Sequence, residues 1–429
     1  MTSATNPRAR GLRPIWLFLG CVVFYHLNGR YIAEIDSYVA PYAAWSLATR
    51  GSFDVSGFAV ATEKAAGATR ALPDGRRVSI YPPGSAIAAL PVIAPLALLA
   101  DEPPKRTAMN RLGKLVAVLY VSATVVLLHA SVRALAPSAV GAATLLAAAG
   151  TLLWSVASQS LWAHGPAAFF VCLAAYLLVV RFPAPSPRAA ILAELALGMA
   201  FLIRPTTVLF AGASGLALLA SRRPREAACL GSAFGLLAAF TFAYNQTWHG
   251  NLLVGGYAGS APPWTTPLWI GIPGLLVAPS RGLLVYSPAF LLLPFGVRRI
   301  LSSRARLSAP QRAQLLFSAL AAAGTVVLYG RFRDWWGGWC FGPRYLIEIL
   351  PILVLVFAFA YQAVAEAWPR WGKRVAWTLV ALSVLVQSLG VFGHHSAWDE
   401  RHGAGAGLFS FRDTQIGSHA RHLLDLVAP

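Results

Sequence analysis

The stretch from residue 313 to residue 364 decides the fold, because it holds two long apolar runs and a short polar segment between them. It reads AQLLFSALAAAGTVVLYG (313–330), RFRDWWGGWCFGPR (331–344) and YLIEILPILVLVFAFAYQAV (345–364). An apolar run of about 20 residues can cross the hydrocarbon core of a bilayer as a helix. The polar segment therefore lies where two membrane helices reach the surface. Its arginines and tryptophans indicate a site for an anionic, partly apolar ligand.

The same apolar pattern recurs along the chain. Hydrophobic residues make up 57% of the 429 residues, and charged residues only 12%. This profile is typical of a polytopic membrane protein and argues against a soluble globular core. We predict an all-α bundle of transmembrane helices over residues 1–392, with no large soluble domain. The other apolar runs lie at 14–29, 84–100, 113–132, 139–157, 161–181, 189–203, 205–220, 227–243, 283–297 and 374–392.

The basic residues set the expected orientation. Lysine and arginine number 35 against 16 acidic residues, which gives a formal charge of +19. Most arginines stand in short loops between apolar runs, as the positive-inside rule predicts, so the charge does not indicate nucleic-acid binding. We place the N-terminus and these basic loops on the cytoplasmic side of the inner or plasma membrane. The loops are 222–225, 298–312 and 370–374.

The external regions follow from counting apolar runs between those loops. They are 30–83, 244–282, 331–344 and a short tail at 393–429. A cytoplasmic N-terminus and an external tail require an odd number of crossings, which we put at 11 or 13. One run must then be re-entrant, or one more crossing is hidden. Pro91 and Pro95 interrupt the run at 84–100 and make it a candidate for re-entry.

The first external loop (30–83) carries the acidic residues best placed for chemistry. Glu34 and Asp36 emerge after the first apolar run, and the apolar spacing at 38–47 predicts a short helix in the membrane interface. Acids this close to hydrocarbon are costly unless solvated, paired or bound to a metal. Either one of them is a general base, with or without a divalent ion, or both belong to a solvated loop. Tyr81 stands where the loop returns to the membrane and could line the same site.

Three arginines stand at the predicted external ends of apolar runs, each beside proline or glycine. They are Arg204, Arg281 and Arg344. An arginine near the interface can extend its head group into water at low cost, which explains each one taken singly. Three guanidinium groups on one face favour a phosphate-binding site, because the planar fork matches phosphate oxygens.

Two histidines are further candidates for contact with a substrate. His164 lies between two apolar runs, where a capped loop histidine is also common, and His249 lies in the second large external region. The four cysteines stand singly, without the spacing of a disulfide framework or a zinc site.

Five short motifs occur along the chain. They are EID (34–36), YPPG (81–84), LIRPT (202–206), PSRGLLVYSP (279–288) and WWGGW followed by FGPRY (335–345). In this order and spacing they resemble the GT-C glycosyltransferases, integral-membrane enzymes that use polyprenyl-phosphate-linked sugars. The resemblance is to the branch with the lipid A aminoarabinose transferases and the proteins similar to protein O-mannosyltransferases, and it runs along most of the chain.

The resemblance implies an inverting sugar transfer on the outer face of the membrane, from a polyprenyl-phosphate donor to a hydroxyl of a glycan, lipid or protein. Asp36 matches the acid that serves the family as catalytic base or metal ligand, with Glu34 beside it. Arg344 and Arg204 match groups that hold the lipid phosphate. Where the family often has a second acid, this chain has His164, which leaves the requirement for a divalent metal ion open.

The polar segment 331–345 then becomes one wall of the expected donor pocket. Arg344 would bind the phosphate there, and Asp334 would be a second acid. The aromatic residues expected to contact the sugar or the prenyl chain are Trp335, Trp336 and Tyr345. An aromatic belt at the membrane interface would produce much the same pattern.

Two other classes of function are compatible with the sequence. A lipid-linked glycan flippase or small-solute transporter would also place arginines along a membrane pathway. Many transporters carry internal repeats, however, and none is visible in this sequence. A non-catalytic membrane scaffold would leave the carboxylates and arginines without a role. The polar residues gather at one predicted face, which favours the transferase.

Overall fold

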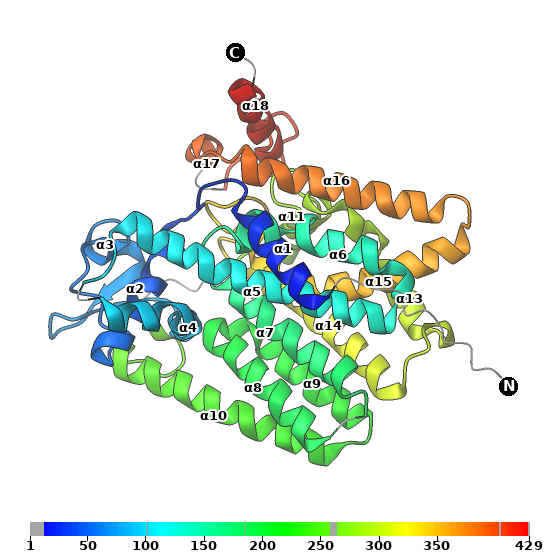
Figure 1. The fold of residues 1–429 in the computed structure, drawn as a ribbon, viewed down its shortest axis with the longest axis horizontal. Coiled ribbons are helices and arrows are strands. Elements are labelled where there is room, and N and C mark those ends of the chain that lie inside the picture. The colour runs from blue at the N-terminus through cyan, green and yellow to red at the C-terminus, as the bar shows by residue number, and fades with distance from the viewer. Residues whose placement is uncertain (1–12, 101, 185, 258–263, 403–404, 428–429) are drawn as a thin grey trace.

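The computed structural model describes residues 13–100, 102–184, 186–257, 264–402 and 405–427, and this part of the chain forms a helical bundle with one two-stranded sheet (Figure 1). The first segment is α1 (Pro14–His26), and the first loop follows it with α2 (Ile35–Arg50), α3 (Ala59–Thr62) and the antiparallel strands β1 (Thr69–Ala71) and β2 (Arg77–Ser79). The later helices are α4 (Gly84–Leu99), α5 (Arg106–Leu135), α6 (Val140–Ala149), α7 (His164–Tyr176), α8 (Pro187–Ile203), α9 (Val208–Ala220), α10 (Pro224–His249), α11 (Leu268–Val277), α12 (Leu283–Tyr286), α13 (Leu293–Leu301), α14 (Ala309–Arg331), α15 (Leu350–Ala367), α16 (Gly372–Phe392), α17 (Ala397–His402) and α18 (Gln415–Val427).

The predicted all-α membrane fold is confirmed, since helical segments cover the predicted apolar runs. The run 283–297 is divided into α12, a 3₁₀ turn at Pro288–Leu292 and α13. In the described residues, seven helical segments are long and apolar enough to cross a membrane, and several shorter apolar helices accompany them. One of the shorter ones is α4, which continues through Pro91 and Pro95. Another is α11, which the sequence analysis missed inside the second external region. The predicted number of crossings, 11 or 13, stays a prediction.

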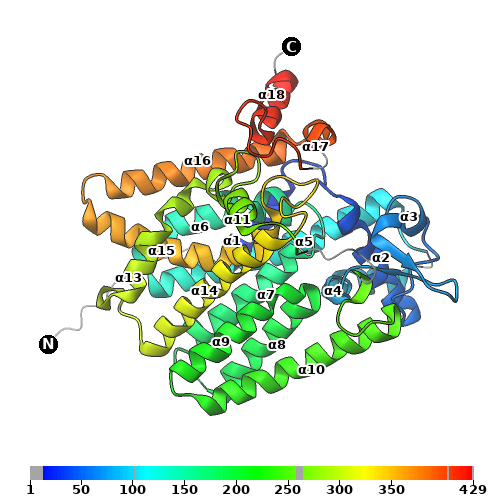
Figure 2. The same ribbon diagram turned by 180° about the vertical axis from the view of Figure 1, so that it is seen from behind.

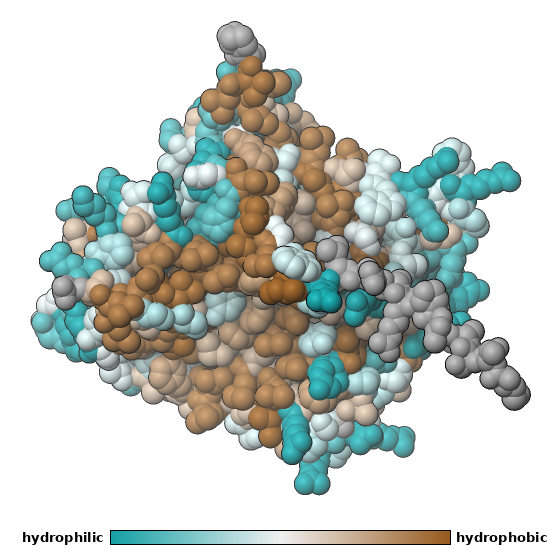
Figure 3. Space-filling view, in the orientation of Figure 1, coloured by the Kyte–Doolittle hydropathy of each residue, from teal (hydrophilic) through white to brown (hydrophobic). Residues whose placement is uncertain are grey.

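The two ends of the bundle differ in composition. The first loop and β1–β2 lie at one end, and the basic loops between α9 and α10, α13 and α14, and α15 and α16 lie at the opposite end with the start of α1 (Figures 1 and 2). Figure 3 shows a broad hydrophobic area over the middle of one face, with hydrophilic residues gathered toward the two ends. This arrangement matches a bundle whose middle is surrounded by lipid.

The helix α15 lies at the centre of the bundle. It packs against α13, α14, α16, α6 and α7. Of the apolar window in the segment Arg344–Ala367, 83% is buried, whereas only 22% of the window in α10 is buried at the periphery. Because Arg344 begins the 3₁₀ turn that leads into α15, the residues of this turn belong to the most buried of the seven long apolar segments.

The helix predicted in the first loop is present as α2, and its place in the membrane interface stays a prediction. Its buried side, which includes Val39, Tyr42 and Trp45, packs against α4. The helix ends at Gly51, whose φ of 63° lies in the left-handed region that glycine adopts without a steric cost. This packing fixes the first turn of α2, and therefore Asp36, against the end of the bundle.

Candidate functional site

Asp36 is held by two partners from distant parts of the chain. Its Oδ2 lies 2.7 Å from Nη1 of Arg344, and the hydroxyl of Tyr81 donates a hydrogen bond of 2.7 Å to its Oδ1. Burial raises the pKa of this carboxyl, but the charge of Arg344 and the Tyr81 hydroxyl outweigh burial and hold the pKa below its usual value. Asp36 is therefore an oriented, ionised carboxylate at neutral pH.

Arg344 reaches Asp36 from the end of the polar segment 331–344. The chain approaches through Gly342, whose φ is +73° and where an added Cβ would lie 2.6 Å from the ring of Tyr286. The guanidinium of Arg344 lies 4.8 Å from the ring centroid of Trp162, within the range of a cation–π contact. Its Nε is buried without a hydrogen-bond partner among the described residues.

Arg204 belongs to a second polar cluster. Its Nε lies 2.6 Å from Oε1 of Glu348, and the same oxygen lies 2.9 Å from Nδ1 of His164. Nη1 of Arg204 lies 3.5 Å from Nε2 of His164, and its Nη2 donates to the hydroxyl of Tyr329. Since a guanidinium can only donate, this arrangement fits the histidine tautomer that has its proton on Nδ1, facing Glu348.

Aromatic rings support this second cluster. Tyr329 and Tyr345 stack with ring centroids 4.7 Å apart and planes at 8°. The guanidinium of Arg204 lies 5.6 Å and 5.7 Å from the centroids of these two rings. Thr206 completes the contacts, with its hydroxyl 3.0 Å from that of Tyr329. The stack holds the guanidinium from one side while Glu348 holds its edge.

A cavity that is partly open to solvent joins the two clusters and is here called the first cavity. Asp36 and Tyr81 line it from the first loop, and Trp162, His164 and Arg204 line it from the bundle. Arg344 lies behind Asp36 and is not on the wall. The cavity thus presents one carboxylate and one guanidinium, each oriented by a counter-charge behind it.

Glu34 lines a different, smaller space, here called the second cavity. Trp162 is the one residue that lines both cavities. Burial, and then the charge of Asp399, raise the pKa of Glu34 to about 7. Although Glu34 and Asp36 are only two residues apart, they face separate spaces.

Comparison with known proteins connects this geometry to a fold. The family model described as dolichyl-phosphate-mannose-protein mannosyltransferase matches residues 110–248. ArnT from Cupriavidus metallidurans in the apo state superposes with a TM-score of 0.57 at 14% identity, covering 88% of this chain and 75% of ArnT. ArnT bound to undecaprenyl phosphate gives a TM-score of 0.56 at 14% identity and 95% and 75% coverage. The chain has a GT-C fold.

A more distant structure agrees with this GT-C fold. The oligosaccharyltransferase of Archaeoglobus fulgidus, tethered to an acceptor peptide containing the NVT sequon, superposes with a TM-score of 0.54 at 10% identity. The match covers 90% of this chain but 56% of that protein. No curated protein sequence matches the chain. The predicted resemblance to GT-C glycosyltransferases is confirmed at the level of the fold.

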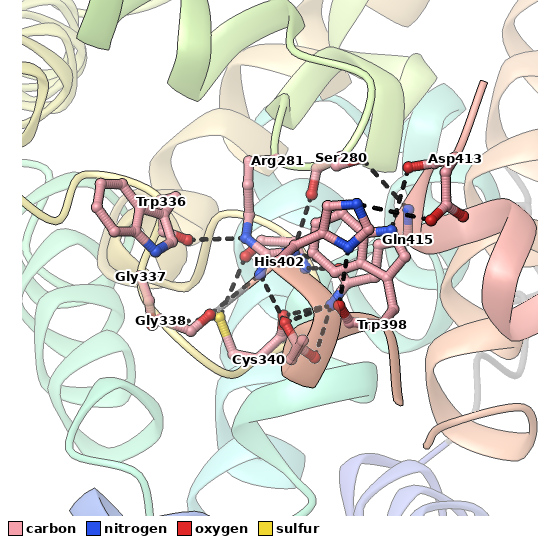
Figure 4. A network of polar contacts seen from close by, with 12 residues as sticks. Ser280, Arg281, Trp336, Gly337, Gly338, Cys340, Trp398, His402, Asp413 and Gln415 are labelled. Atoms are coloured by element: carbon pink, nitrogen blue, oxygen red, sulfur yellow. Dashed lines mark hydrogen bonds and ion pairs between the residues drawn. The ribbon is translucent and has the colours of Figure 1, made fainter. Parts of the chain in front are cut away.

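The structure does not bring Arg281 to the site, which corrects its assignment to a phosphate. Arg281 is only 1% exposed. It forms an ion pair of 2.9 Å with Asp399 and donates to the carbonyl oxygens of Trp336 and Gly338 and to the side chain of Gln415 (Figure 4). All of these partners belong to the polar segment or to the C-terminal tail, so the arginine joins the tail to the segment.

Three other predicted contacts of the polar segment also lie away from the first cavity. Trp335 is buried against Gly274 of α11, and Trp336 packs beside it at a ring distance of 6.1 Å. Asp334 is exposed and lies 3.4 Å from the guanidinium of its neighbour Arg333. These three residues contact neighbours outside the first cavity. Of the residues predicted to form the wall of the donor pocket, only Arg344 and Tyr345 reach the polar clusters.

His249 is likewise separated from the first cavity by aromatic rings. It lies near the end of α10, with its ring 5.7 Å from that of Tyr244, and Tyr244 contacts Phe53 at 5.0 Å. Phe53, not His249, lines the cavity. The expectation of direct sugar contact by His249 is therefore not supported by this geometry.

The residues at the site do not fit a divalent cation. Both oxygens of Asp36 accept from Arg344 or Tyr81, and Glu34 faces the second cavity. In the part of the chain that the structure describes, no group of three or more His, Cys, Asp and Glu side chains is arranged to hold a metal ion. Two guanidinium groups beside the carboxylates would also repel a cation.

Three residues of the site were not predicted from the sequence: Glu348, Tyr329 and Trp162. A signal for Glu348 was present, because it is an acid inside the apolar run 345–364, and an acid in such a run is costly unless paired. Tyr329 and Trp162 gave no comparable signal, since aromatic residues at the ends of membrane helices are common.

Proposed function

We propose that this chain is a membrane glycosyltransferase that transfers a sugar from a polyprenyl-phosphate donor to an acceptor hydroxyl, at the end of the bundle that carries the first loop. One observation carries the proposal: Asp36 and Arg204 line one cavity, each oriented by a buried counter-charge. The mannosyltransferase family model over residues 110–248 and the fold shared with ArnT bound to undecaprenyl phosphate support it.

Asp36 serves as the general base. The acceptor oxygen attacks the anomeric carbon, the bond from that carbon to the phosphate oxygen breaks, and the acceptor proton passes to Asp36. A carboxylate of lowered pKa suffices because the hydroxyl becomes strongly acidic as its new bond forms. Attack opposite the departing phosphate inverts the anomeric centre. Tyr81 and Arg344 are positioning residues that keep the carboxylate in one orientation.

Arg204 binds the donor phosphate. Among the three arginines predicted for this role, it alone lines the first cavity. Its guanidinium is oriented in advance by Glu348, Tyr329 and Tyr345, so little reorganisation is needed as charge develops on the leaving phosphate. Tyr345 and His164 support the guanidinium from the sides. Arg344, expected from the sequence to bind the phosphate, instead orients Asp36.

The test uses purified protein in nanodiscs with a panel of undecaprenyl-phosphate sugars, and it measures release of undecaprenyl phosphate in the presence of membrane extract as a source of acceptor. We expect Asp36→Asn to abolish release, because the amide cannot accept the proton. The matched control is Glu63→Gln, an exposed acid of the same loop. Full activity in Asp36→Asn would overturn the assignment of the base.

A further inference from the structure

The part of the polar segment from residue 332 to residue 343 forms no helix or strand. Backbone N–H and C=O groups outside helices and strands need partners from elsewhere when they are buried. Arg281 supplies partners for part of this segment, and Gln415, the first residue of α18, supplies them for the turn 340–342 (Figure 4). Gln415 is 0% exposed, so its hydrogen bonds are shielded from competing water.

Gln415 binds the backbone on both sides of Phe341. Its Nε2 donates a hydrogen bond of 2.8 Å to the carbonyl oxygen of Cys340, and the N–H of Gly342 donates one of 3.1 Å to its Oε1. A side-chain amide can donate and accept at once, so this pair of bonds fixes both the position and the direction of the turn. Arg344 follows two residues later, and its N–H donates to the carbonyl oxygen of Gly342 at 3.0 Å. The hydrogen bonds of Gln415 are therefore connected to the backbone of Arg344 through one residue.

The amide of Gln415 is itself oriented by its surroundings. Its Oε1 also accepts from Nη1 of Arg281 at 2.6 Å and from the hydroxyl of Tyr286 at 2.9 Å, and its Nε2 lies 3.2 Å from Oδ2 of Asp399. Turning the amide over would set its NH₂ group against the guanidinium and against the N–H of Gly342, because neither of these groups can accept. The amide therefore has one favoured orientation and is a fixed support for the turn.

Aromatic packing holds the same turn from two sides. The ring of His419 in α18 stacks on that of Phe341, with centroids 5.1 Å apart and planes at 24°. On α16, Gly390 leaves the space that Phe341 fills, because an added Cβ there would lie 2.2 Å from the ring of Phe341. The turn is thus fixed by α18 through polar and apolar contacts together.

We propose that Gln415 is a positioning residue for the catalytic carboxylate, acting through the turn 340–342 and Arg344. The inference rests on the proposed function, in which Asp36 is the base. Nη1 of Arg344 lies 2.7 Å from Oδ2 of Asp36, and a displacement of about 1 Å would take this pair beyond hydrogen-bonding distance. No residue of α18 is among those that line the two cavities, yet its first residue sets the geometry of the base.

The first experiment measures the pH dependence of donor cleavage in nanodiscs for Gln415→Met and for a matched control, Gln387→Met. Gln387 is also 0% exposed, and its hydrogen-bond partners include Ser155 and Tyr286 rather than the turn. Both substitutions remove a buried amide of the same size, so both are expected to lower the stability of the protein. Only the change at Gln415 should reach the site.

We expect Gln415→Met to lower kcat about 10–100-fold, because a small misplacement of a catalytic group has an effect of that order. Burial raises the pKa of Asp36 and the charge of Arg344 lowers it, so a displaced Arg344 lets this pKa rise. The base must be ionised, and the low-pH limb of kcat/KM therefore moves to higher pH. Gln387→Met should keep the wild-type limb even where less of it folds.

A double-mutant cycle of thermal unfolding midpoints tests the same coupling without turnover. Gln415 and Asp36 share no hydrogen bond in the described chain, so their effects should add if Gln415 only stabilises the tail. We expect Asp36→Asn to lower the midpoint about half as much or less in the Gln415→Met background as in wild type, since the ion pair with Arg344 is already displaced there. In the Gln387→Met background the effect of Asp36→Asn should be unchanged.

Gln415→Asn, which keeps the amide on a shorter side chain, takes the place of Gln415→Met if that variant does not fold. The positioning role is overturned by a low-pH limb that stays at the wild-type pH in the Gln415 variant. Additive midpoints in its cycle with Asp36→Asn overturn it as well. If wild-type protein cleaves no donor at any pH, the proposed function is contradicted, and the cycle by itself decides whether Gln415 is coupled to Asp36.

Discussion

At the scale of single residues, the proposed chemistry depends on the contact between Asp36 and Tyr81. The phenol donates to the carboxylate at 2.7 Å, and a hydrogen bond to a charged group contributes roughly 1.5–3 kcal/mol. Removing it leaves the carboxylate in place through Arg344 but free to rotate. The orientation of the base, rather than its presence, is then what changes.

We predict that Tyr81→Phe lowers turnover roughly 10–100-fold, which is what 1.5–3 kcal/mol corresponds to. The KM for the donor should stay within a factor of about two, because Tyr81 orients the carboxylate and Arg204 binds the phosphate in our account. The control is Tyr38→Phe, which removes a hydroxyl from the same loop that donates to the Ala33 carbonyl. Equal losses in both variants would assign the effect to the loop in general.

At the scale of elements, the polar segment 331–344 involves two arginines of different roles, one at the site and one structural. Their local sequences look alike. Arg281 and Arg344 each stand beside proline or glycine in the sequence, yet one pairs with Asp399 of the tail and the other with Asp36 of the first loop. The pairing depends on tertiary contacts more than 100 residues apart in sequence. The apolar pattern predicted α2 and the membrane helices, whereas no local pattern could assign these partners.

We predict that Arg281→Ala destabilises the protein, because breaking a buried ion pair costs roughly 3–5 kcal/mol. The measurement is the thermal unfolding midpoint in detergent. Arg333→Ala is the matched control, since its partner Asp334 is exposed and such surface pairs contribute roughly 0–1 kcal/mol. If Arg281→Ala unfolded like wild type but no longer bound undecaprenyl phosphate, Arg281 would be assigned to phosphate binding, and its structural role would be contradicted.

At the scale of the whole molecule, the basic loops and the first loop lie at opposite ends of the bundle (Figure 1). Composition and the apolar runs were sufficient to predict the fold and these two ends. They could not predict that the site divides into two cavities around Trp162, because that division depends on side-chain packing between segments. Glu348 was partly predictable, since an acid inside an apolar run is a signal that the sequence alone provides.

We predict that the two ends lie on opposite sides of the membrane. Single cysteines at Asp74 in the first loop and at Lys373 in the first turn of α16, both at exposed positions, are introduced in a Cys229→Ser background. An impermeant maleimide should label position 74 in intact cells and position 373 only after permeabilisation, because the basic loops are retained in the cytoplasm. Labelling of both positions from one side would contradict the topology.

Separating binding from transfer tests the central claim, that one cavity combines a phosphate-binding arginine with a catalytic carboxylate. Undecaprenyl phosphate affinity and donor cleavage are measured for Asp36→Asn and Arg204→Ala. The account predicts that Asp36→Asn binds undecaprenyl phosphate as wild type does but does not cleave the donor, while Arg204→Ala loses about tenfold or more in affinity. Wild-type affinity in Arg204→Ala, or wild-type cleavage in Asp36→Asn, would contradict it.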